Sequence, residues 1–268
     1  MPFADINGQR LYYEDSGGDG PAVLFSHGFL MDHSMFDPQV SELAPEFRCI
    51  TWDERGFGQT EFDGKPFTYW DSAADALALL DHLGVQEAVL AGMSQGGFLS
   101  LRAALTAPDR VRALVLIDTQ AGREDPAVLD AYGGMIDTWT AGGERQELFD
   151  GIAALILGQG CDPEPWTRRW HAAPPENLRQ PADCLLGRED LTDRLREITC
   201  PALVIHGTED AAIALDRAEA LCQGLPGCRG IVQVEGAGHA ANLTHPELVN
   251  PALRAFLSDL APAGAPAS

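Results

Sequence analysis

A Gly-x-Ser-x-Gly motif occupies residues 92–96, between a short apolar run and a stretch typical of a helix. A serine on a very tight turn from a strand into a helix takes a strained backbone conformation, and side chains two residues away on either side would collide. Glycine at Gly92 and Gly96 removes that collision. The motif therefore predicts that Ser94 is a nucleophile at the carboxyl end of a strand, near the positive end of the following helix.

A nucleophilic serine needs a base, and seven histidines compete for that role. His239 directly follows the last apolar run, in the segment Glu235–His239, so its loop opens at the same sheet edge as Ser94. We therefore assign the base to His239. The others lie in predicted helices, at a strand end, in a central insertion or too early in the chain: His27, His33, His82, His171, His206 and His245. Of these, His206 is expected to be packed or loop-bonded, and His27 is a candidate for shaping the site from below.

The base in turn needs an orienting carboxylate. Asp210 follows a predicted strand in the segment His206–Asp210 and gives the chain order Ser, Asp, His. Two alternatives are Asp118, which ends the preceding strand, and Glu209, which is adjacent to Asp210. We favour Asp210 and interpret Asp118 as a structural residue that binds loop amides.

Acyl transfer also creates a negative oxygen, which needs backbone N–H donors held away from water. We expect one donor to be Gln95, in the first turn of the helix after the nucleophile. The other is expected to be Phe29, in the segment Ser26–Phe29, where Gly28 lets the backbone turn toward the site.

The elements that must position these residues alternate between strands and helices. The pair Asn7-Gly8 between two extended runs predicts an opening hairpin. Six short apolar runs have the length of strands that are buried on both faces: Ala22–Phe25, Cys49–Trp52, Ala88–Ala91, Val111–Ile117, Ala202–Ile205 and Ile231–Val234. This alternation predicts an α/β protein with a mostly parallel, doubly wound sheet of about eight strands.

Helical patterns separate the apolar runs. The clearest places four apolar residues on one face, with Gly84 as the expected end: Ala73, Ala76, Leu77 and Leu80. A second helix is predicted from about Gln95 to Pro108. In the last helix, Pro251 lacks the N–H that continues the hydrogen-bond pattern, so we expect a break or kink there.

The alternation is interrupted once, between Ile117 and Ala202. The roughly eighty residues in between have no strand signal but include a helical pattern at Leu148, Ile152, Leu155 and Ile156, and a structureless loop of that length is uncommon. We therefore predict a helical cap over residues 119–198, inserted into a core formed by residues 1–118 and 199–260. Residues 261–268 are predicted to be a disordered tail.

Composition narrows the class of protein. The 268 residues carry a net charge of −22, which argues against binding to nucleic acid or to an anionic membrane. No apolar run approaches the roughly 20 residues that span a bilayer, and the first ten residues lack the regions of a signal peptide. The six cysteines lack metal-ligand spacing and favour buried thiols over a disulfide framework. We expect a reduced, cytoplasmic protein that binds no metal. Its expected partner is a small-molecule substrate, and the sequence leaves open whether the chain forms a homo-oligomer.

Together these motifs make nearly the whole chain resemble the α/β-hydrolase superfamily. The matching segments are His27-Gly28, Asp53–Gly58, GMSQGG around Ser94, GTED ending at Asp210 and GAGHAANLTHPE around His239. The short cap is most similar to the branch with 3-oxoadipate enol-lactonase-like proteins, small carboxylesterases and cofactor-free haloperoxidase relatives. The resemblance implies a triad of Ser94, Asp210 and His239, oxyanion donors Phe29 and Gln95, and neither a metal nor an organic cofactor.

Two departures from the family pattern weaken any assignment of one substrate. Gln95 stands where many relatives have Met or Leu, and Gln59-Thr60 stands where a serine often ends the loop that begins at Asp53. Epoxide hydrolases and haloalkane dehalogenases of this fold use an aspartate nucleophile, so Ser94 argues against both.

The expected function is a serine hydrolase that cleaves a small, largely apolar carboxylic ester or lactone through an acyl-enzyme on Ser94. Eight large residues would make the pocket apolar if a few of them line it: Met31, Trp70, Met93, Phe98, Met135, Trp139, Trp166 and Trp170. Three alternatives stay open. They are a carbon–carbon bond hydrolase, for which Arg168 and Arg169 could hold a substrate carboxylate, a perhydrolase or haloperoxidase activity, and a small-molecule receptor on a hydrolase scaffold.

Overall fold

The computed structural model describes residues 2–158 and 161–260. Within them, one 8-stranded sheet has the order β1-β2-β4-β3-β5-β6-β7-β8. Strand β2 is antiparallel to both of its neighbours, and the remaining pairs are parallel, which confirms the predicted α/β sheet. The strands are β1 (Phe3–Ile6), β2 (Gln9–Asp15), β3 (Ala22–Ser26), β4 (Arg48–Trp52), β5 (Ala88–Met93), β6 (Val111–Ile117), β7 (Ala202–Gly207) and β8 (Cys228–Val234).

The predicted strands are all present, and the opening hairpin turns at Asn7 and Gly8, whose φ angles of 48° and 79° are both positive. The burial predicted for the last strand is wrong. Strand β8 lies at the edge of the sheet, so its residues are mostly half-buried and only Val234 is buried. An edge strand has a neighbour on one side only, which leaves part of its length open to solvent.

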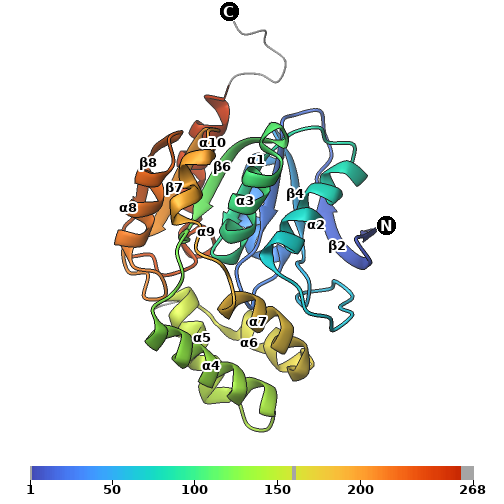
Figure 1. Cartoon of the computed structure of the whole chain (residues 1–268), viewed down its shortest axis with the longest axis vertical. Helices are drawn as coiled ribbons and strands as arrows, with labels where there is room; N and C mark the ends of the chain where they lie inside the picture. Colours follow the sequence, from blue (N-terminus) through green and yellow to red (C-terminus); the bar gives the residue numbers. More distant parts are fainter. Residues whose placement is uncertain (1, 159–160, 261–268) are drawn as a thin grey trace, which may run out of the picture.

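Helices cover both faces of the sheet. Helices α1 (Asp37–Leu43) and α10 (Pro246–Ser258) pack on one face, and α2 (Tyr69–His82), α3 (Gln95–Thr106) and α8 (Leu215–Gly224) pack on the other (Figure 1). Alternate residues of β3 point to opposite faces of the sheet. Val23 and Phe25 belong to the core that α10 covers, and Leu24 belongs to the core that α2 and α3 cover. Both faces are therefore buried, which explains why the central strands read as continuous apolar runs.

The outer helices largely follow the sequence pattern. Helix α2 buries Ala73, Ala76 and Leu80, leaves Leu77 half-buried, and is followed by Gly84 with a φ of +69°. The prediction of a break at Pro251 is wrong, because α10 continues through that residue. A proline removes one hydrogen bond of a helix, and the buried face of α10, which includes Val249 and Leu253, holds the helix against the sheet. A kink at this position stays a prediction.

Short helices complete the description of the core and the insertion. They are α9 (Ala241–Thr244) and the 3-10 helices η1 (His33–Phe36), η2 (Pro108–Arg110), η3 (Pro175–Leu178) and η4 (Thr192–Glu197). Residues 261–268, predicted to be a disordered tail, lie outside the described residues.

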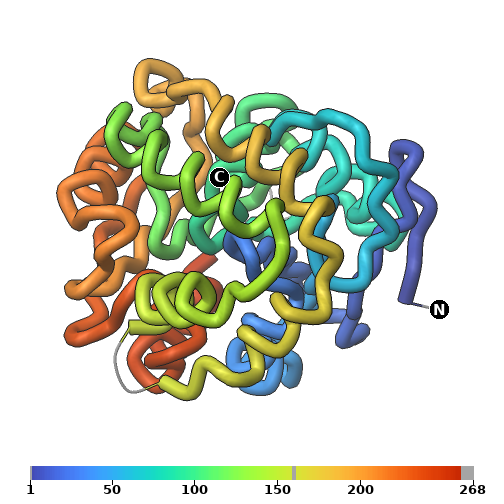
Figure 2. The backbone as a smooth tube through the Cα atoms, turned by 90° about the horizontal axis from the view of Figure 1, so that it is seen from below, coloured from blue at the N-terminus to red at the C-terminus, as the bar shows by residue number. Residues whose placement is uncertain are grey.

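Four helices, here called the cap helices, lie between β6 and β7. They are α4 (Pro126–Ala141), α5 (Gln146–Leu157), α6 (Glu164–Ala172) and α7 (Arg179–Leu186). Figure 1 shows them together at one end of the sheet, and Figure 2, seen from below, shows them lying across the core. The division into core and cap at residues 119 and 198 stays a prediction.

The cysteines differ from expectation at one pair. Cys222 in α8 and Cys228 at the start of β8 form a disulfide, with their Cα atoms 5.4 Å apart, so the prediction of free thiols is wrong for these two residues. The turn between α8 and β8 brings them together. Of the free cysteines, Cys49 and Cys184 are buried as predicted, whereas Cys161 and Cys200 are half-buried. Among the described residues, no helix is long and apolar enough to cross a membrane.

Candidate active site

Ser94 forms the sharp turn that joins β5 to α3. Its φ and ψ angles are 49° and −113°, a sparsely populated conformation that costs on the order of 1–3 kcal/mol. A Cβ atom at Gly92 would lie 2.1 Å from the carbonyl oxygen of Gly96, and one at Gly96 would lie 2.0 Å from that of Ser26. Neither distance leaves room for a carbon atom, so the turn requires glycine at both positions.

A chain of hydrogen bonds joins the three residues expected to form the triad. Nε2 of His239 lies 3.0 Å from Oγ of Ser94, and Nδ1 lies 2.8 Å from Oδ2 of Asp210. The other carboxylate oxygen of Asp210 accepts the backbone N–H groups of Ala212 and Ile213. Asp210 thereby holds a proton on Nδ1 and leaves the lone pair of Nε2 facing the Ser94 hydroxyl.

The charges of this chain favour proton transfer to the histidine. Burial lowers the pKa of His239, but the Asp210 carboxylate and the smaller effects of Asp118 and Glu124 together outweigh burial, and the net shift is upward. Burial raises the pKa of Asp210, but His239 and the backbone donor of Ile213 outweigh it, and the net shift is downward. An imidazolium at His239 is therefore stabilised by a carboxylate that stays ionised.

Asp118 lies beside this chain and binds loop amides, as predicted. Its buried carboxylate accepts the backbone N–H of Gly207 at 2.8 Å and that of Ala241 at 2.9 Å. It therefore connects the turn that carries Asp210 with the loop that carries His239. Burial, with the Asp210 carboxylate as a second cause, raises the pKa of Asp118 to about 8.

The two expected oxyanion donors are available for a ligand. Among the described residues, the backbone N–H groups of Phe29 and Gln95 have no protein acceptor. A Cβ atom at Gly28 would lie 2.4 Å from Sδ of Met93 and 3.7 Å from Cβ of Ser94, so glycine allows this backbone to approach Ser94. The arrangement offers two N–H donors close to the position where an oxyanion would form.

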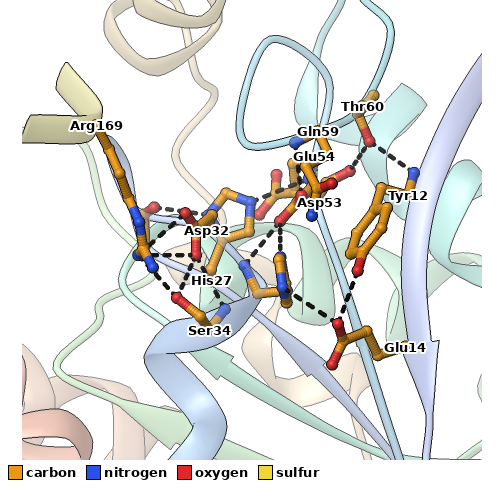
Figure 3. Close-up of polar contacts among 12 residues, drawn as sticks. Tyr12, Glu14, His27, Asp32, Ser34, Asp53, Glu54, Gln59, Thr60 and Arg169 are labelled. Atoms are coloured by element: carbon orange, nitrogen blue, oxygen red, sulfur yellow. Dashed lines mark hydrogen bonds and ion pairs between the residues drawn. The ribbon is translucent and has the colours of Figure 1, made fainter. Parts of the chain in front are cut away.

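His27 supports the loop after β3 (residues 27–32) from within the core, as considered for it. Nδ1 of this buried ring donates to the carbonyl oxygen of Gly28 at 2.8 Å, and Nε2 accepts the backbone N–H of Glu54 at 3.0 Å (Figure 3). His206 is likewise a loop-bonded histidine, since its Nε2 lies 2.9 Å from the carbonyl oxygen of Ile213.

The segment Asp53–Gly58 holds the first residue of η1, directly after the same loop, through a buried carboxylate. Asp53 accepts the backbone N–H and the Nδ1–H of His33 at 2.7 and 2.8 Å, and its other oxygen accepts the backbone N–H of Gln59 at 2.7 Å. A Cβ atom at Gly58 would lie 2.1 Å from this carboxylate, so the turn needs glycine. The motif therefore acts at a distance from Ser94, by fixing residues that follow Phe29, the expected oxyanion donor.

Cap helix α6 contacts this loop directly, a contact that no motif in the sequence predicts. The indole N–H of Trp170 donates to the carbonyl oxygen of Leu30 at 2.7 Å, and Leu30 has a φ of +66°. The guanidinium of Arg169 donates to Oδ1 of Asp32 at 3.3 Å and to Oγ of Ser34 at 2.8 Å (Figure 3). The backbone next to Phe29 is thus held from the core on one side and from the cap on the other.

A cavity of about 60 Å³, here called the Ser94 pocket, opens onto Ser94 and His239. The cap helices contribute Tyr132, Met135, Ile152, Leu155, Ile156 and Leu185, and the core contributes Phe29, Leu30, Met31, Met93, Phe98, Ala212 and Ile213, with Glu124 from the loop after β6. Four of the eight large residues considered for the pocket therefore line it, namely Met31, Met93, Phe98 and Met135. The three tryptophans of the cap line a larger cavity of about 580 Å³ that shares Leu30 and Met31 with the Ser94 pocket.

Comparison with known proteins agrees with this fold. Residues 21–246 match the family described as alpha/beta hydrolase fold. The chain belongs to the α/β-hydrolase family. A 2-(acetamidomethylene)succinate hydrolase from Mesorhizobium japonicum is 30% identical to this hydrolase, over 90% of the chain and 89% of the relative.

Two solved structures have the same architecture as this α/β-hydrolase. A thermophilic esterase from Thermogutta terrifontis superposes with a TM-score of 0.85 at 30% identity, covering 97% of each chain. An enol-lactonase from Burkholderia xenovorans LB400 superposes with a TM-score of 0.86 at 26% identity, covering 96% of this chain and 100% of that one.

The arginines considered for a carboxylate-binding role lie elsewhere in this hydrolase. Arg168 is exposed beside Glu164, Arg169 binds the loop after β3, and neither lines the Ser94 pocket. Arg188 is a buried arginine that the sequence analysis did not identify. It forms an ion pair with Glu124, with an N–O distance of 2.9 Å. Glu124 could have been suspected from its position in the loop after β6, at the same sheet edge as Ser94.

Two groups in the described part of the hydrolase place carboxylate and imidazole atoms close enough to hold a cation. They are Asp32, His33 and Asp53, and Asp118, His206 and Asp210. In the first, Asp53 already accepts three hydrogen bonds and Asp32 pairs with the cation of Arg169. In the second, both oxygens of Asp118 accept backbone N–H groups. The side chains are thus explained by these contacts, and we assign a metal to neither group.

Proposed function

We propose that this α/β-hydrolase is a serine hydrolase that cleaves a small, largely apolar carboxylic ester or lactone through an acyl-enzyme on Ser94. The observation that carries the proposal is the hydrogen-bonded chain from Ser94 through His239 to Asp210, at 3.0 and 2.8 Å. A serine, a base and an orienting carboxylate in this order are what nucleophilic acyl transfer requires.

The reaction proceeds in two halves. His239 takes the proton of Ser94 as the serine oxygen attacks the carbonyl carbon, and the N–H groups of Phe29 and Gln95 stabilise the oxyanion. The oxyanion collapses, His239 returns the proton to the leaving alcohol, and the acyl group stays on Ser94. Water then attacks this acyl-enzyme with His239 as the base, which releases the acid and restores the serine.

The shape and lining of the Ser94 pocket support a small, mostly apolar substrate. The cavity of about 60 Å³ is lined largely by aliphatic, Met and Phe side chains. The similar structures include an esterase and an enol-lactonase, which supports an ester or a lactone as the substrate class. The net charge of −22 favours a small uncharged partner over nucleic acid or a membrane. A cytoplasmic location is part of the proposal, and the disulfide of Cys222 counts against it because disulfides are rare in reducing compartments.

The test is hydrolysis of p-nitrophenyl acetate and p-nitrophenyl butyrate by the wild type and by Ser94→Ala. We expect sustained turnover in the wild type and none above background in the variant. Ser72→Ala is the matched control, because Ser72 is also buried and its hydroxyl has no partner among the described residues. Turnover that persists in folded Ser94→Ala would contradict the proposal. No turnover in any folded protein would favour a carbon–carbon bond hydrolase or a receptor.

A further inference from the structure

The Ser94 pocket is apolar except for the two site residues and two further polar side chains, Glu124 and Tyr132. We propose that Glu124 and Tyr132 form a subsite for an uncharged hydrogen-bonding group of the substrate, a hydroxyl or an amide, and that this subsite excludes a substrate carboxylate. The inference rests on the proposed function, since it concerns the substrate of the same site.

Glu124 lines the pocket and uses only one of its two carboxylate oxygens in hydrogen bonds to the described residues. Its Oε1 atom accepts hydrogen bonds from Nη2 of Arg188 at 2.9 Å and from Nε2 of Gln120. Its Oε2 atom has no donor among the residues that the structure describes, and the side chain is 11% exposed. An accessible carboxylate oxygen without a protein donor can bind a ligand that supplies an O–H or N–H group.

An ion pair with Arg188 compensates the charge of the Glu124 carboxylate in this apolar pocket. The charge of Arg188 itself is not available to a ligand. The guanidinium is 2% exposed, pairs with Glu124, and donates to the carbonyl oxygens of Leu185 and Gly122 at 3.1 and 3.3 Å. It also stacks over the Phe98 ring at 4.4 Å. Arg188 does not line the pocket, whereas Glu124 does. An entering anion therefore meets the negative partner of the pair first.

Tyr132 supplies the complementary donor. Burial, followed by the charge of Glu124, raises the pKa of Tyr132 to about 12, so its hydroxyl keeps its proton at neutral pH. No hydrogen bond involves this hydroxyl among the described residues. A substrate hydroxyl can donate to Glu124 and accept from Tyr132, and an amide can do the same with its N–H and C=O groups.

The subsite also lies within electrostatic reach of the reacting atoms. Glu124 is one of the carboxylates that raise the pKa of His239, after the larger effects of burial and of Asp210 and Asp118. Glu124 also lines the same cavity as Ser94 and His239. A group bound at Glu124 therefore belongs to the molecule being cleaved rather than to a separate ligand.

These contacts set the expected selectivity. A methyl group at the subsite leaves both polar side chains unpaired, so we expect a hydroxyl-bearing ester to exceed its methyl-terminated equivalent in kcat/KM by roughly tenfold or more. A carboxylate in the same place faces Glu124, and we expect the lowest kcat/KM for that substrate.

The experiment compares kcat/KM for two sets of methyl esters, which differ in length so that the depth of the subsite need not be known. One set is methyl pentanoate, methyl 4-hydroxybutanoate and monomethyl succinate, and the other is methyl heptanoate, methyl 6-hydroxyhexanoate and monomethyl adipate. In at least one set the wild type should prefer the hydroxyl and disfavour the carboxylate. In Glu124→Gln, the carboxylate-to-methyl ratio of kcat/KM should rise by roughly tenfold, because the repelling charge is gone and Arg188 is unpaired.

Two further variants keep the test decisive. Asp125→Asn makes the same acid-to-amide change at the next residue, whose side chain is 74% exposed, and should keep the wild-type ratios. If Glu124→Gln does not fold, the double variant Glu124→Leu with Arg188→Met removes both charges, and its hydroxyl-to-methyl ratio should fall by roughly tenfold. Ser94-dependent hydrolysis with ratios that the variants leave unchanged would overturn the subsite alone. No Ser94-dependent hydrolysis of any ester would overturn the proposed function as well.

Discussion

The cap is expected to act on catalysis through one hydrogen bond, from the indole N–H of Trp170 to the carbonyl oxygen of Leu30 at 2.7 Å. Replacing Trp170 with Phe leaves that buried carbonyl without its donor, which costs about 1–3 kcal/mol. Leu30 has a φ of +66°, a conformation that itself costs roughly 1–2 kcal/mol. Because the two energies are similar, loss of the bond should let the backbone relax and move the N–H of the adjacent Phe29.

The rate effect follows from the role of Phe29. Complete loss of one oxyanion donor costs about 10²–10³ in rate, so a displaced donor should lower kcat by roughly 10- to 100-fold in Trp170→Phe. KM should change little, because the oxyanion exists only along the reaction and not in bound substrate. Steady-state kinetics with p-nitrophenyl butyrate and urea unfolding of the same samples measure both effects.

Trp139→Phe is the matched control for this prediction. Trp139 is buried in the cap beside Trp170, and its indole N–H has no acceptor among the described residues. The change therefore removes similar packing but no hydrogen bond, and kcat should stay within about threefold of the wild type. Equal losses of kcat in the two variants, or an unchanged kcat in Trp170→Phe, would refute the coupling between α6 and the oxyanion donor.

Three further measurements test how Ser94, His239 and Asp210 are held together. Asp118→Ala leaves the N–H groups of Gly207 and Ala241 without an acceptor. The free energy of unfolding in urea should fall by roughly 2–5 kcal/mol, and kcat of the folded fraction should fall too. Wild-type stability would contradict the connection between the two loops. The pH profile tests the upward pKa shift of His239: only the neutral ring is a base, so kcat/KM should rise with pH to a half-maximum above the ordinary value of 6.5. Asp210→Asn removes the largest of the carboxylate effects that oppose burial at His239, so that half-maximum should move to lower pH while kcat falls. An unmoved profile would argue against the Asp210 contact.

The central architecture could be predicted because its signals are local. Parallel strands buried on both faces read as short apolar runs, and Gly92, Ser94 and Gly96 report a turn whose geometry allows few other residues. The turns after β5, β7 and β8 open at one edge of the sheet, so the approach of Ser94, Asp210 and His239 follows from strand order alone.

The remaining features depend on packing between segments that are distant in sequence. Glu124 and Arg188 meet only because the loop after β6 and the end of α7 pack together, and neither has a periodic pattern that reports the contact. Trp170 reaches Leu30 across 140 residues of sequence. The pairing of Cys222 with Cys228 depends on the angle between α8 and β8, which composition does not encode.

The central claim is that Ser94 carries the acyl group, and covalent labelling measures this most directly. A p-nitrophenyl alkylphosphonate ester reacts with an activated serine by the same attack, releases p-nitrophenol and leaves a phosphonyl group that hydrolyses slowly. Peptide mass spectrometry should find one phosphonyl group per chain, on Ser94, with release of p-nitrophenol in the same amount. A group on another residue, or no labelling of the folded protein, would contradict the account.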